Sequence, residues 1–205
     1  MRRVVVRTDS LLGPDGPGPG ASVILAFDDG YRSVFEHAFP ILRDAGMSGV
    51  MFLVPALVGQ ESAWERTSGL APRPLLSWND AALLIAAGHE IGSHSLSHAD
   101  LSAVDPSMLA QEVTRSREIL MERLGVRIRA FSVPFGKDDP RLNQALIHAG
   151  YQEKITNAET VPTQIGPLRI RPCIAILNYD TILDFRRKLT GAYDLLHTLR
   201  RWRKR

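Results

Sequence analysis

Short apolar runs that alternate with capped helical segments are the feature that most restricts the fold of this 205-residue chain. The β-branched runs 23–27 and 50–54 are typical of strands that are buried on both faces of a sheet. Strands separated by helices indicate βαβ units, so the pattern predicts an α/β fold with a mainly parallel sheet of about seven strands. Further short strands are expected at 90–93, 130–133, 153–156 and 169–176.

Capping residues mark where the helices of this pattern begin and end. Three helices are predicted over 77–88, 105–125 and 139–150. The first opens on a Ser-x-x-Asp capping box, the other two open on Asp-Pro, and all three end at a glycine. A fourth helix, over 33–45, contains Pro40, which should kink it.

The composition is that of an ordinary globular chain. Hydrophobic residues make up 44% and charged residues 23%, which excludes a disordered or low-complexity chain. Because the composition does not change along the sequence, we expect residues 1–205 to form a single domain. The stretch 59–76 has no periodicity and predicts a long loop near the functional site.

Positive charge is concentrated at the C-terminal end. The last 20 residues hold eight Lys and Arg and one acidic residue, whereas the whole chain has a net charge of +3. The remainder is therefore net negative, which argues against nucleic-acid binding. Apolar residues recur at three- and four-residue spacing over about 180–205 and predict a basic amphipathic helix. We favour an outer helix packed on the barrel, and the alternative is an interfacial helix that contacts an anionic membrane peripherally.

The compartment is indicated only indirectly. The single Cys173 cannot form an internal disulfide, which suits a reducing compartment. The sequence contains no run of about 18 apolar residues, so no membrane-spanning helix is predicted. The basic start has an apolar run of only three residues, over 4–6, which is too short for a signal peptide. As given, the chain is expected to be cytoplasmic, or peripheral to a membrane if its last helix is interfacial.

Three clusters that could carry chemistry follow directly after predicted strands. In a parallel barrel the C-terminal strand ends converge on one face, and catalytic residues gather there. The sequence therefore predicts one pocket built from three separate segments. These segments are Asp28-Asp29-Gly30, His94-Ser95-Leu96-Ser97-His98 and Pro134-Phe135-Gly136.

Two of the clusters together indicate a metal site. His94 and His98 are four residues apart and can bind one metal, although such a pair alone is more often two hydrogen-bonded polar histidines. Adjacent Asp28 and Asp29 are costly at the end of a buried strand unless something compensates them, although Asp-Asp-Gly is also a common turn. Two histidines and one aspartate with an open position form the catalytic type of zinc site, which leaves the other carboxylate as a base.

These residues resemble the motifs of polysaccharide deacetylases, the NodB homology domain of carbohydrate esterase family four. Residues 26–30 are similar to T-F-D-D-G, residues 88–98 to G-H-E-I-G-x-H-[ST]-x-x-H, and residues 131–136 to F-R-x-P-[YF]-G or F-[AS]-Y-P-[YF]-G. The resemblance covers residues 22–156. It implies a distorted (β/α)7 barrel and the metal-dependent removal of N-acetyl, occasionally O-acetyl, groups from a polysaccharide or other acetylated glycan.

The family's functional residues can be carried over onto matching positions. The resemblance implies that Asp29, His94 and His98 hold a divalent metal, and zinc is the ion we expect. Asp28 would be the general base on metal-bound water. The backbone N–H of Phe135 would help to form the oxyanion hole.

Three departures from the family pattern suggest a variant branch. Ser132 stands where many members have an arginine that orients the base. A fourth motif, D-x-x-D-W, is not recognisable around 152–160, and the late L-x-H motif is missing, because 167–172 occupies its place without a histidine. His197 lies within the predicted basic helix and is not assigned that role. The leaving amine would then be protonated by Asp28 after it has served as base.

Two classes of function follow, with a third option. The first is a metal-dependent deacetylase, and the second is a weakly active or inactive sugar-binding relative of the same fold. Asp28 favours the enzyme, because a binding module needs no base beside its metal. A hydrolase of a small amide is the third. Trp64 and Trp78 flank the predicted loop and could stack on sugar rings, although a core role for Trp78 is equally well supported.

Overall fold

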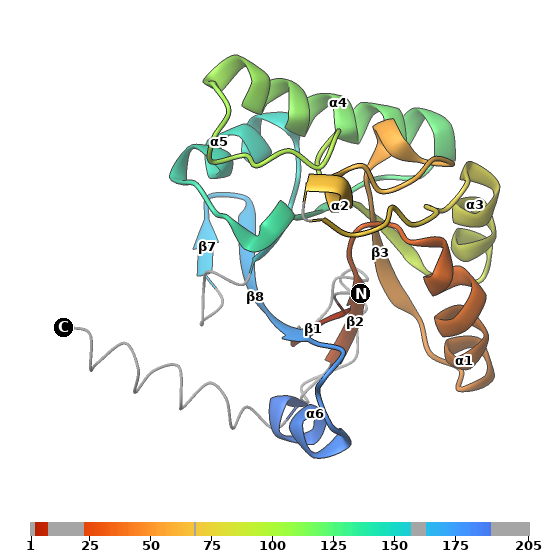
Figure 1. Cartoon of the computed structure of the whole chain (residues 1–205). Helices are drawn as coiled ribbons and strands as arrows, with labels where there is room; N and C mark the ends of the chain where they lie inside the picture. The colour runs from red at the N-terminus through yellow and green to blue at the C-terminus, as the bar shows by residue number, and fades with distance from the viewer. Residues whose placement is uncertain (1–2, 8–22, 68, 157–162, 190–205) are drawn as a thin grey trace.

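The computed structural model describes residues 3–7, 23–67, 69–156 and 163–189, and its centre is a curled sheet (Figure 1). Among the described residues, the neighbours around the sheet are β1, β2, β3, β4, β5, β6 and β8 in that order, and β1 also pairs with β8. β1 runs antiparallel to both of its neighbours, and the other pairs in this series are parallel. The expected α/β fold, a distorted (β/α)7 barrel, is confirmed.

For each strand that the sequence predicted, the observed bounds lie within one residue of the predicted ones. The antiparallel strands β1 and β7 were not predicted. The apolar run of β1 and the whole of β7 are only three residues long, which is too short to be distinguished from a loop. The strands are β1 (Arg3–Arg7), β2 (Val23–Phe27), β3 (Gly49–Leu53), β4 (Glu90–Ser93), β5 (Ala130–Ser132), β6 (Glu153–Thr156), β7 (Thr163–Ile165) and β8 (Leu168–Ile176).

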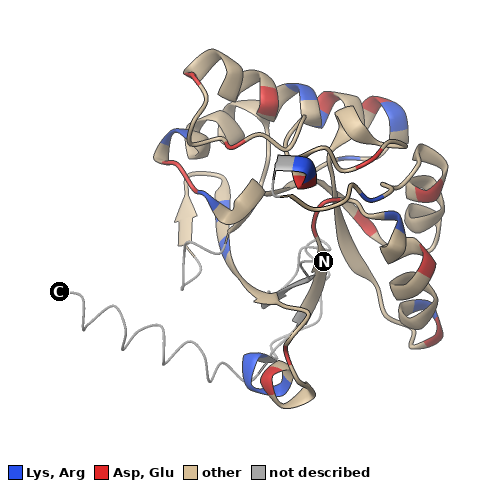
Figure 2. Cartoon of the chain, viewed as in Figure 1, with Lys and Arg blue, Asp and Glu red and all other residues tan. Residues whose placement is uncertain are grey.

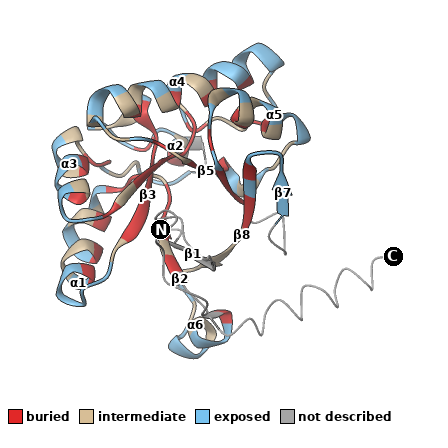
Figure 3. Cartoon of the chain, turned by 180° about the vertical axis from the view of Figure 1, so that it is seen from behind, coloured by how far each residue is buried: buried red, intermediate tan, exposed pale blue. Residues whose placement is uncertain are grey.

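Helices cover much of the outside of the curled sheet, and their outward faces are exposed, whereas β2 to β6 are largely buried and β7 is exposed (Figure 3). The part of the chain that the structure describes contains no helix that is long and apolar enough to cross a membrane. The helices are the π-helix η1 (Val34–Ala38), α1 (Phe39–Asp44), the 3-10 helix η2 (Pro55–Leu57), α2 (Trp64–Thr67), α3 (Trp78–Ala86), α4 (Pro106–Leu124), the 3-10 helix η3 (Pro134–Gly136), α5 (Pro140–Ala149) and α6 (Ile182–Leu189).

The predicted caps form as the sequence indicated. The Ser77 side chain accepts a hydrogen bond from the Asp80 N–H, and the Asp80 carboxylate accepts one from the Ser77 N–H, so both halves of the capping box are present. Asp105 accepts hydrogen bonds from two N–H groups in the first turn of α4, and Gly125 ends that helix with φ 67°. Local sequence therefore sets the bounds of the outer helices.

The helix predicted over 33–45 is divided rather than simply kinked. Its first part is the π-helix η1, in which the Phe39 N–H donates to the Val34 carbonyl five residues back. Pro40 then lies in the first turn of α1, where a missing N–H costs no hydrogen bond. The proline is accommodated by starting a new helix.

Two apolar layers hold the barrel together. The larger layer lies between the strands and the helices, and includes Phe27, Met51 and Phe131. The smaller layer fills the inside of the curled sheet. Phe52 occupies much of this interior because Gly92 leaves room for its ring: a Cβ at Gly92 would lie 2.4 Å from Phe52 Cε1. The inner layer consists of Ile24, Ala26, Val50, Phe52, Ala130 and Ile155, with Cys173 packed against it.

The stretch 59–76 is largely irregular, as predicted, but it contains the short helix α2. It is tied to the rest of the chain by isolated bridges between Tyr31 and Leu75 and between Glu61 and Pro74. At the other end of the chain, the basic helix expected over about 180–205 is represented by α6, and residues 190–205 lie outside the described residues.

Candidate metal centre

The candidate site lies where the parallel strands end. Asp28 and Asp29 come directly after β2, His94 directly after β4, and Phe135 three residues after β5. These are the strand ends at which the sequence predicted a shared pocket. The structure brings side chains from all three segments together.

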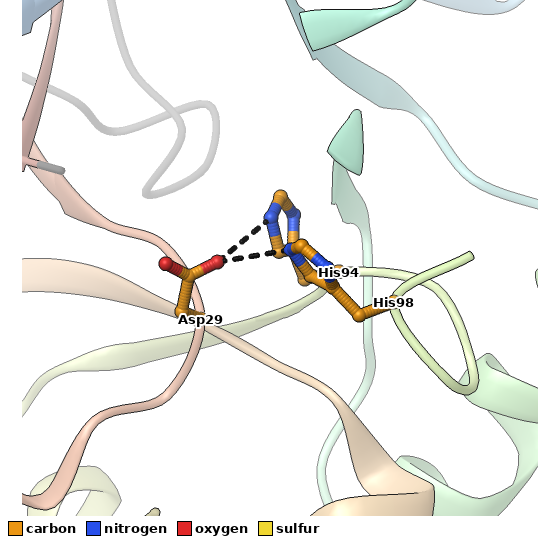
Figure 4. Close-up of side chains that lie close together, drawn as sticks. All are labelled: Asp29, His94 and His98. Atoms are coloured by element: carbon orange, nitrogen blue, oxygen red, sulfur yellow. Dashed lines mark hydrogen bonds and ion pairs between the residues drawn. The ribbon is translucent and has the colours of Figure 1, made fainter. Parts of the chain in front are cut away.

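Asp29, His94 and His98 point toward one another (Figure 4). Asp29 Oδ1 lies 3.3 Å from His94 Nε2 and 3.1 Å from His98 Nε2. One ligand atom of each residue lies within 4.8 Å of the others. One carboxylate oxygen and two imidazole nitrogens form a donor set that suits a divalent transition metal, and among the described residues this group alone has the ligands to hold an ion.

His94 is oriented by the backbone of the neighbouring strand. Its Nδ1–H donates to the carbonyl oxygen of Ser132 at 2.8 Å. That bond fixes the tautomer, so that Nε2 can face Asp29 with a lone pair available for a metal. The ring is almost fully buried, which holds this orientation.

The loop that carries His98 is held by a buried acid from α4. Glu112 accepts hydrogen bonds from the N–H groups of Leu96 and Ser97 at 2.9 and 3.0 Å and from Ser97 Oγ at 2.6 Å. The Ser95 hydroxyl accepts a hydrogen bond from the His98 N–H at 3.0 Å. Sequence reasoning missed Glu112, because a single glutamate on a helix gives no local sign of a partner in a distant loop.

Burial and charge oppose each other at this centre. Burial would raise the pKa of Asp29, but hydrogen bonds and positive charge from His94 and His98 outweigh it and hold that pKa far below its usual range. Burial would lower the pKa of His94, but the Asp28 and Asp29 carboxylates outweigh it and raise that pKa. The pKa of His98 is lowered, chiefly by burial. The centre favours a carboxylate next to positive charge, as a metal would supply.

Asp28 and Phe135 also lie at this centre. Asp28 is buried, and its carboxylate is close enough to His94 to act on the pKa of that ring. The Phe135 ring meets the His98 ring edge to face at a centroid distance of 4.5 Å. Phe135 is 43% exposed, so its ring lies at the surface beside the buried histidines.

Backbone strain is concentrated in the same loops. Four non-glycine residues among those described have positive φ: Asp29 at 73°, Ser95 at 62°, His98 at 64° and Phe135 at 56°. All four belong to the three segments of the candidate site. Left-handed backbone is costly for such residues and persists where surrounding structure enforces it, which is a feature of functional sites.

The two tryptophans near the predicted loop have different surroundings. The Trp64 ring stacks on the His98 ring, with centroids 4.0 Å apart and planes 24° apart. Trp78 packs partly buried against the main core, beneath the guanidinium of Arg123. The core role considered for Trp78 is the one observed. The Trp64 face that meets His98 is covered by that ring.

Comparison with known proteins identifies the family. The family model described as polysaccharide deacetylase matches residues 15–153, more than half of the chain, and the chain therefore belongs to that family. YxkH of Bacillus subtilis (strain 168), whose name carries the same description, is 23% identical over 134 residues, which are 65% of this chain and 44% of YxkH. The chain spans less than half the length of the curated relatives it matches.

Solved structures share the fold. The Streptococcus pyogenes deacetylase PplD, determined in complex with acetate, has a TM-score of 0.68 at 20% identity, over 81% of this chain and 69% of that one. A de-N-acetylase from Aggregatibacter actinomycetemcomitans has a TM-score of 0.65 at 18% identity, over 80% and 73%. IcaB from Ammonifex degensii has a TM-score of 0.58 at 26% identity, over 67% of this chain and 60% of IcaB.

Proposed function

We propose that this protein is a metal-dependent hydrolase that removes N-acetyl, or in some substrates O-acetyl, groups from a polysaccharide or glycan precursor. The observation that carries the proposal is the convergence of Asp29, His94 and His98 at the strand ends, with Asp28 buried beside them. Membership of the polysaccharide deacetylase family supports the same reaction class.

The proposed metal ligands are Asp29, His94 and His98, and zinc is the proposed ion. Two neutral imidazoles and one carboxylate are a common ligand set of catalytic zinc. When bound, such a metal would polarise the acetyl carbonyl and lower the pKa of a water molecule beside it. The Ser132 carbonyl supports this assignment, because it holds the His94 ring with Nε2 facing Asp29.

Asp28 is the proposed general base, and Phe135 the proposed oxyanion donor. Asp28 accepts a proton from the attacking water as the water oxygen bonds to the acetyl carbon. The Phe135 N–H donates a hydrogen bond to the carbonyl oxygen as negative charge develops there. When the bond from carbon to nitrogen breaks, the nitrogen takes the proton held by Asp28 and leaves as the amine, and the acetyl group leaves as acetic acid, which then releases its proton to become acetate.

The proposal that Asp28 also protonates the amine depends on a second proposal, that this chain belongs to a variant branch without the family's late histidine motif. Among the other described histidines, His37 lines a groove between α1 and α6, His89 accepts a hydrogen bond from the Gly49 N–H, and His148 is exposed on α5. His197 lies outside the described residues. Asp28 is therefore the group that we assign to both proton transfers.

The alternative is a sugar-binding relative of the same fold with little or no turnover. Asp28 favours the enzyme, because a binding module needs no base beside its metal. A hydrolase of a small amide would use the same groups.

Acetate release from a panel of N-acetylated and O-acetylated glycans tests the proposal, together with metal analysis of the purified protein. We expect release that stops when the metal is chelated and returns when zinc is added. Glycan binding without release in the metal-loaded protein would favour the sugar-binding alternative. Release from small acetamides alone would favour the third option.

We also propose that residues 1–205 act as one domain whose C-terminal end is an outer helix of the barrel, and the alternative is that this end contacts an anionic membrane peripherally. The membrane alternative is supported by the surface around α6, where Tyr179, Ile182 and, on α1, Ile41 are 75%, 71% and 70% exposed. Ile41 and Ile182 line an apolar groove of about 440 Å³ between α1 and α6. Basic residues follow on the last turn of α6 (Figure 2). Exposed apolar side chains beside positive charge suit an anionic interface.

A further inference from the structure

The two histidines of the candidate centre are supported in different ways. Nδ1 of His94 donates to the Ser132 carbonyl. Nδ1 of His98 is buried and has no hydrogen-bond partner in another residue of the described chain. A histidine that binds metal through Nε2 usually donates its other N–H to a fixed acceptor, which sets the orientation of the ring. The His98 ring therefore needs another means of orientation.

Two aromatic rings contact the imidazole of His98. Trp64 stacks almost parallel to the imidazole at a centroid distance of 4.0 Å, and Phe135 meets it edge to face at 4.5 Å. The planes of Trp64 and His98 differ by 24°, and those of Phe135 and His98 by 72°. A ring enclosed in this way cannot turn about its Cβ–Cγ bond without first displacing a neighbour.

Trp64 is itself fixed by a buried polar network. Its Nε1–H donates to the Tyr31 hydroxyl at 3.3 Å, and that hydroxyl donates to Glu65 Oε1 at 2.9 Å. Arg73 forms an ion pair with Glu65, and its guanidinium lies 4.1 Å above the centre of the Tyr31 ring. Ser62 Oγ donates to Glu65 Oε2 at 2.7 Å. The network gives Trp64 a defined position although it lies in a largely irregular segment.

We infer that Trp64 is a positioning residue for the metal ligand His98, and that its ring replaces the hydrogen bond that His98 lacks at Nδ1. The inference rests on the proposed function, because it requires that His98 bind a metal. It assigns the stretch 59–76 a role in metal affinity. The indole acts through His98 and makes no contact with the reacting atoms in this role.

The test is the binding of Co²⁺ to metal-free protein, followed by visible absorption, which reports the geometry of the ligands. We expect Trp64→Leu to bind Co²⁺ about 10- to 100-fold more weakly than wild type, as for loss of other groups that orient a metal ligand. Its absorption band should also change in shape. Trp64→Phe keeps an aromatic face on His98 and should recover most of the affinity and the wild-type band.

Trp78→Leu is the matched control, since it removes an indole that packs on the main core and beneath Arg123 rather than on a metal ligand. It should lower the melting temperature and leave Co²⁺ affinity unchanged. Should Trp64→Leu fail to fold, Tyr31→Phe removes only the hydroxyl that fixes Trp64, and a weaker Co²⁺ affinity is expected there too.

Wild-type affinity and an unchanged band in Trp64→Leu, or in Tyr31→Phe if only that variant folds, would overturn the inference. A rise in the KM for glycan with unaltered Co²⁺ affinity would also overturn it, because Trp64 would then be a sugar-stacking residue. If the wild-type protein itself bound no Co²⁺, the proposed function would fail first, and the inference with it.

Discussion

The backbone carbonyl of Ser132 accepts the hydrogen bond that orients His94, at 2.8 Å from Nδ1. Ser132 occupies the position at which many family members are expected to have an arginine. Because the contact with His94 uses the backbone, it does not depend on which side chain stands there. The orientation of His94 is therefore compatible with the serine of this chain.

Replacing either histidine should remove the metal. In His94→Ala or His98→Ala one of three proposed ligands is lost, and the remaining two hold a divalent ion poorly. Elemental analysis of the purified variants is the measurement, and substoichiometric metal is expected in both. His148→Ala is the matched control, because His148 is exposed on α5. Full occupancy in both site variants would exclude this ligand set.

Replacing the two aspartates should have different effects on metal content and on acetate release. Asp28→Asn is expected to keep its metal and to lose about 10²-fold or more in acetate release, as for loss of a general base. Asp29→Asn should lose metal as well, because one oxygen of its carboxylate faces Nε2 of both histidines. Metal content and acetate release are measured on the same preparations. Metal loss in Asp28→Asn with full loading of Asp29→Asn would reverse the roles.

Much of this arrangement could be predicted from sequence, because it is set by local rules. The capping box at Ser77 and the glycine at 125 act within a few residues, so the helices were located well. Convergence of Asp29, His94 and His98 follows from a general property of parallel strands, whose C-terminal ends meet. Neither inference needed a distant contact.

The rest depends on contacts between residues that are far apart in sequence. Glu112 reaches the His98 loop, and Trp64 reaches the His98 ring, although 15 or more residues separate each pair in the sequence. β1 becomes a strand because β2 and β8 both offer it partners. Such tertiary effects override local propensity, and no pattern in a single sequence records them.

Packing inside the barrel predicts a strong effect at Gly92. In Gly92→Ala the new Cβ would lie 2.4 Å from Phe52 Cε1, so the ring must shift within a filled interior. We expect a loss of about 1–3 kcal/mol in unfolding free energy, measured by denaturant titration. Phe52→Leu in the same chain should recover part of that loss, because the two changes share one contact. Gly92→Ala with wild-type stability would contradict this packing.

Glu65 should make the metal-free protein sensitive to acid. Its hydrogen bond with Arg73 outweighs burial and lowers the pKa of Glu65 below its usual value of 4.5. Its contribution to stability is therefore present above about pH 4.5 and is lost as the pH falls through the lowered pKa of the folded state. Glu65→Gln should be less stable at pH 7 by about 1–3 kcal/mol.

Denaturant titrations of metal-free protein from pH 7 to pH 3 give the measurement, because acid would also release a metal from the histidines. The difference between wild type and Glu65→Gln should shrink as the pH falls below 4.5. Glu118→Gln is a suitable control, since Glu118 pairs with Arg115 on the exposed face of α4. A constant difference across this range would show that the Glu65 carboxylate adds no acid-sensitive stability.

The last prediction concerns the basic end of the chain. Deleting residues 198–205 removes five positive charges and no negative one. We favour an outer helix of the barrel, for which truncation should lower the melting temperature. If this end is instead an interfacial anchor, each lost cation should weaken attachment to anionic vesicles by about 1 kcal/mol. Full-length protein should then sediment with such vesicles at low salt and be released at high salt, because salt screens the attraction. The truncated protein should remain in solution with its metal content and its activity on soluble substrates unchanged. Ile182→Ser should also weaken sedimentation, because Ile182 is 71% exposed beside the groove. A lower melting temperature after truncation, with no vesicle binding by the full-length chain, would instead identify this end as an outer layer of the barrel.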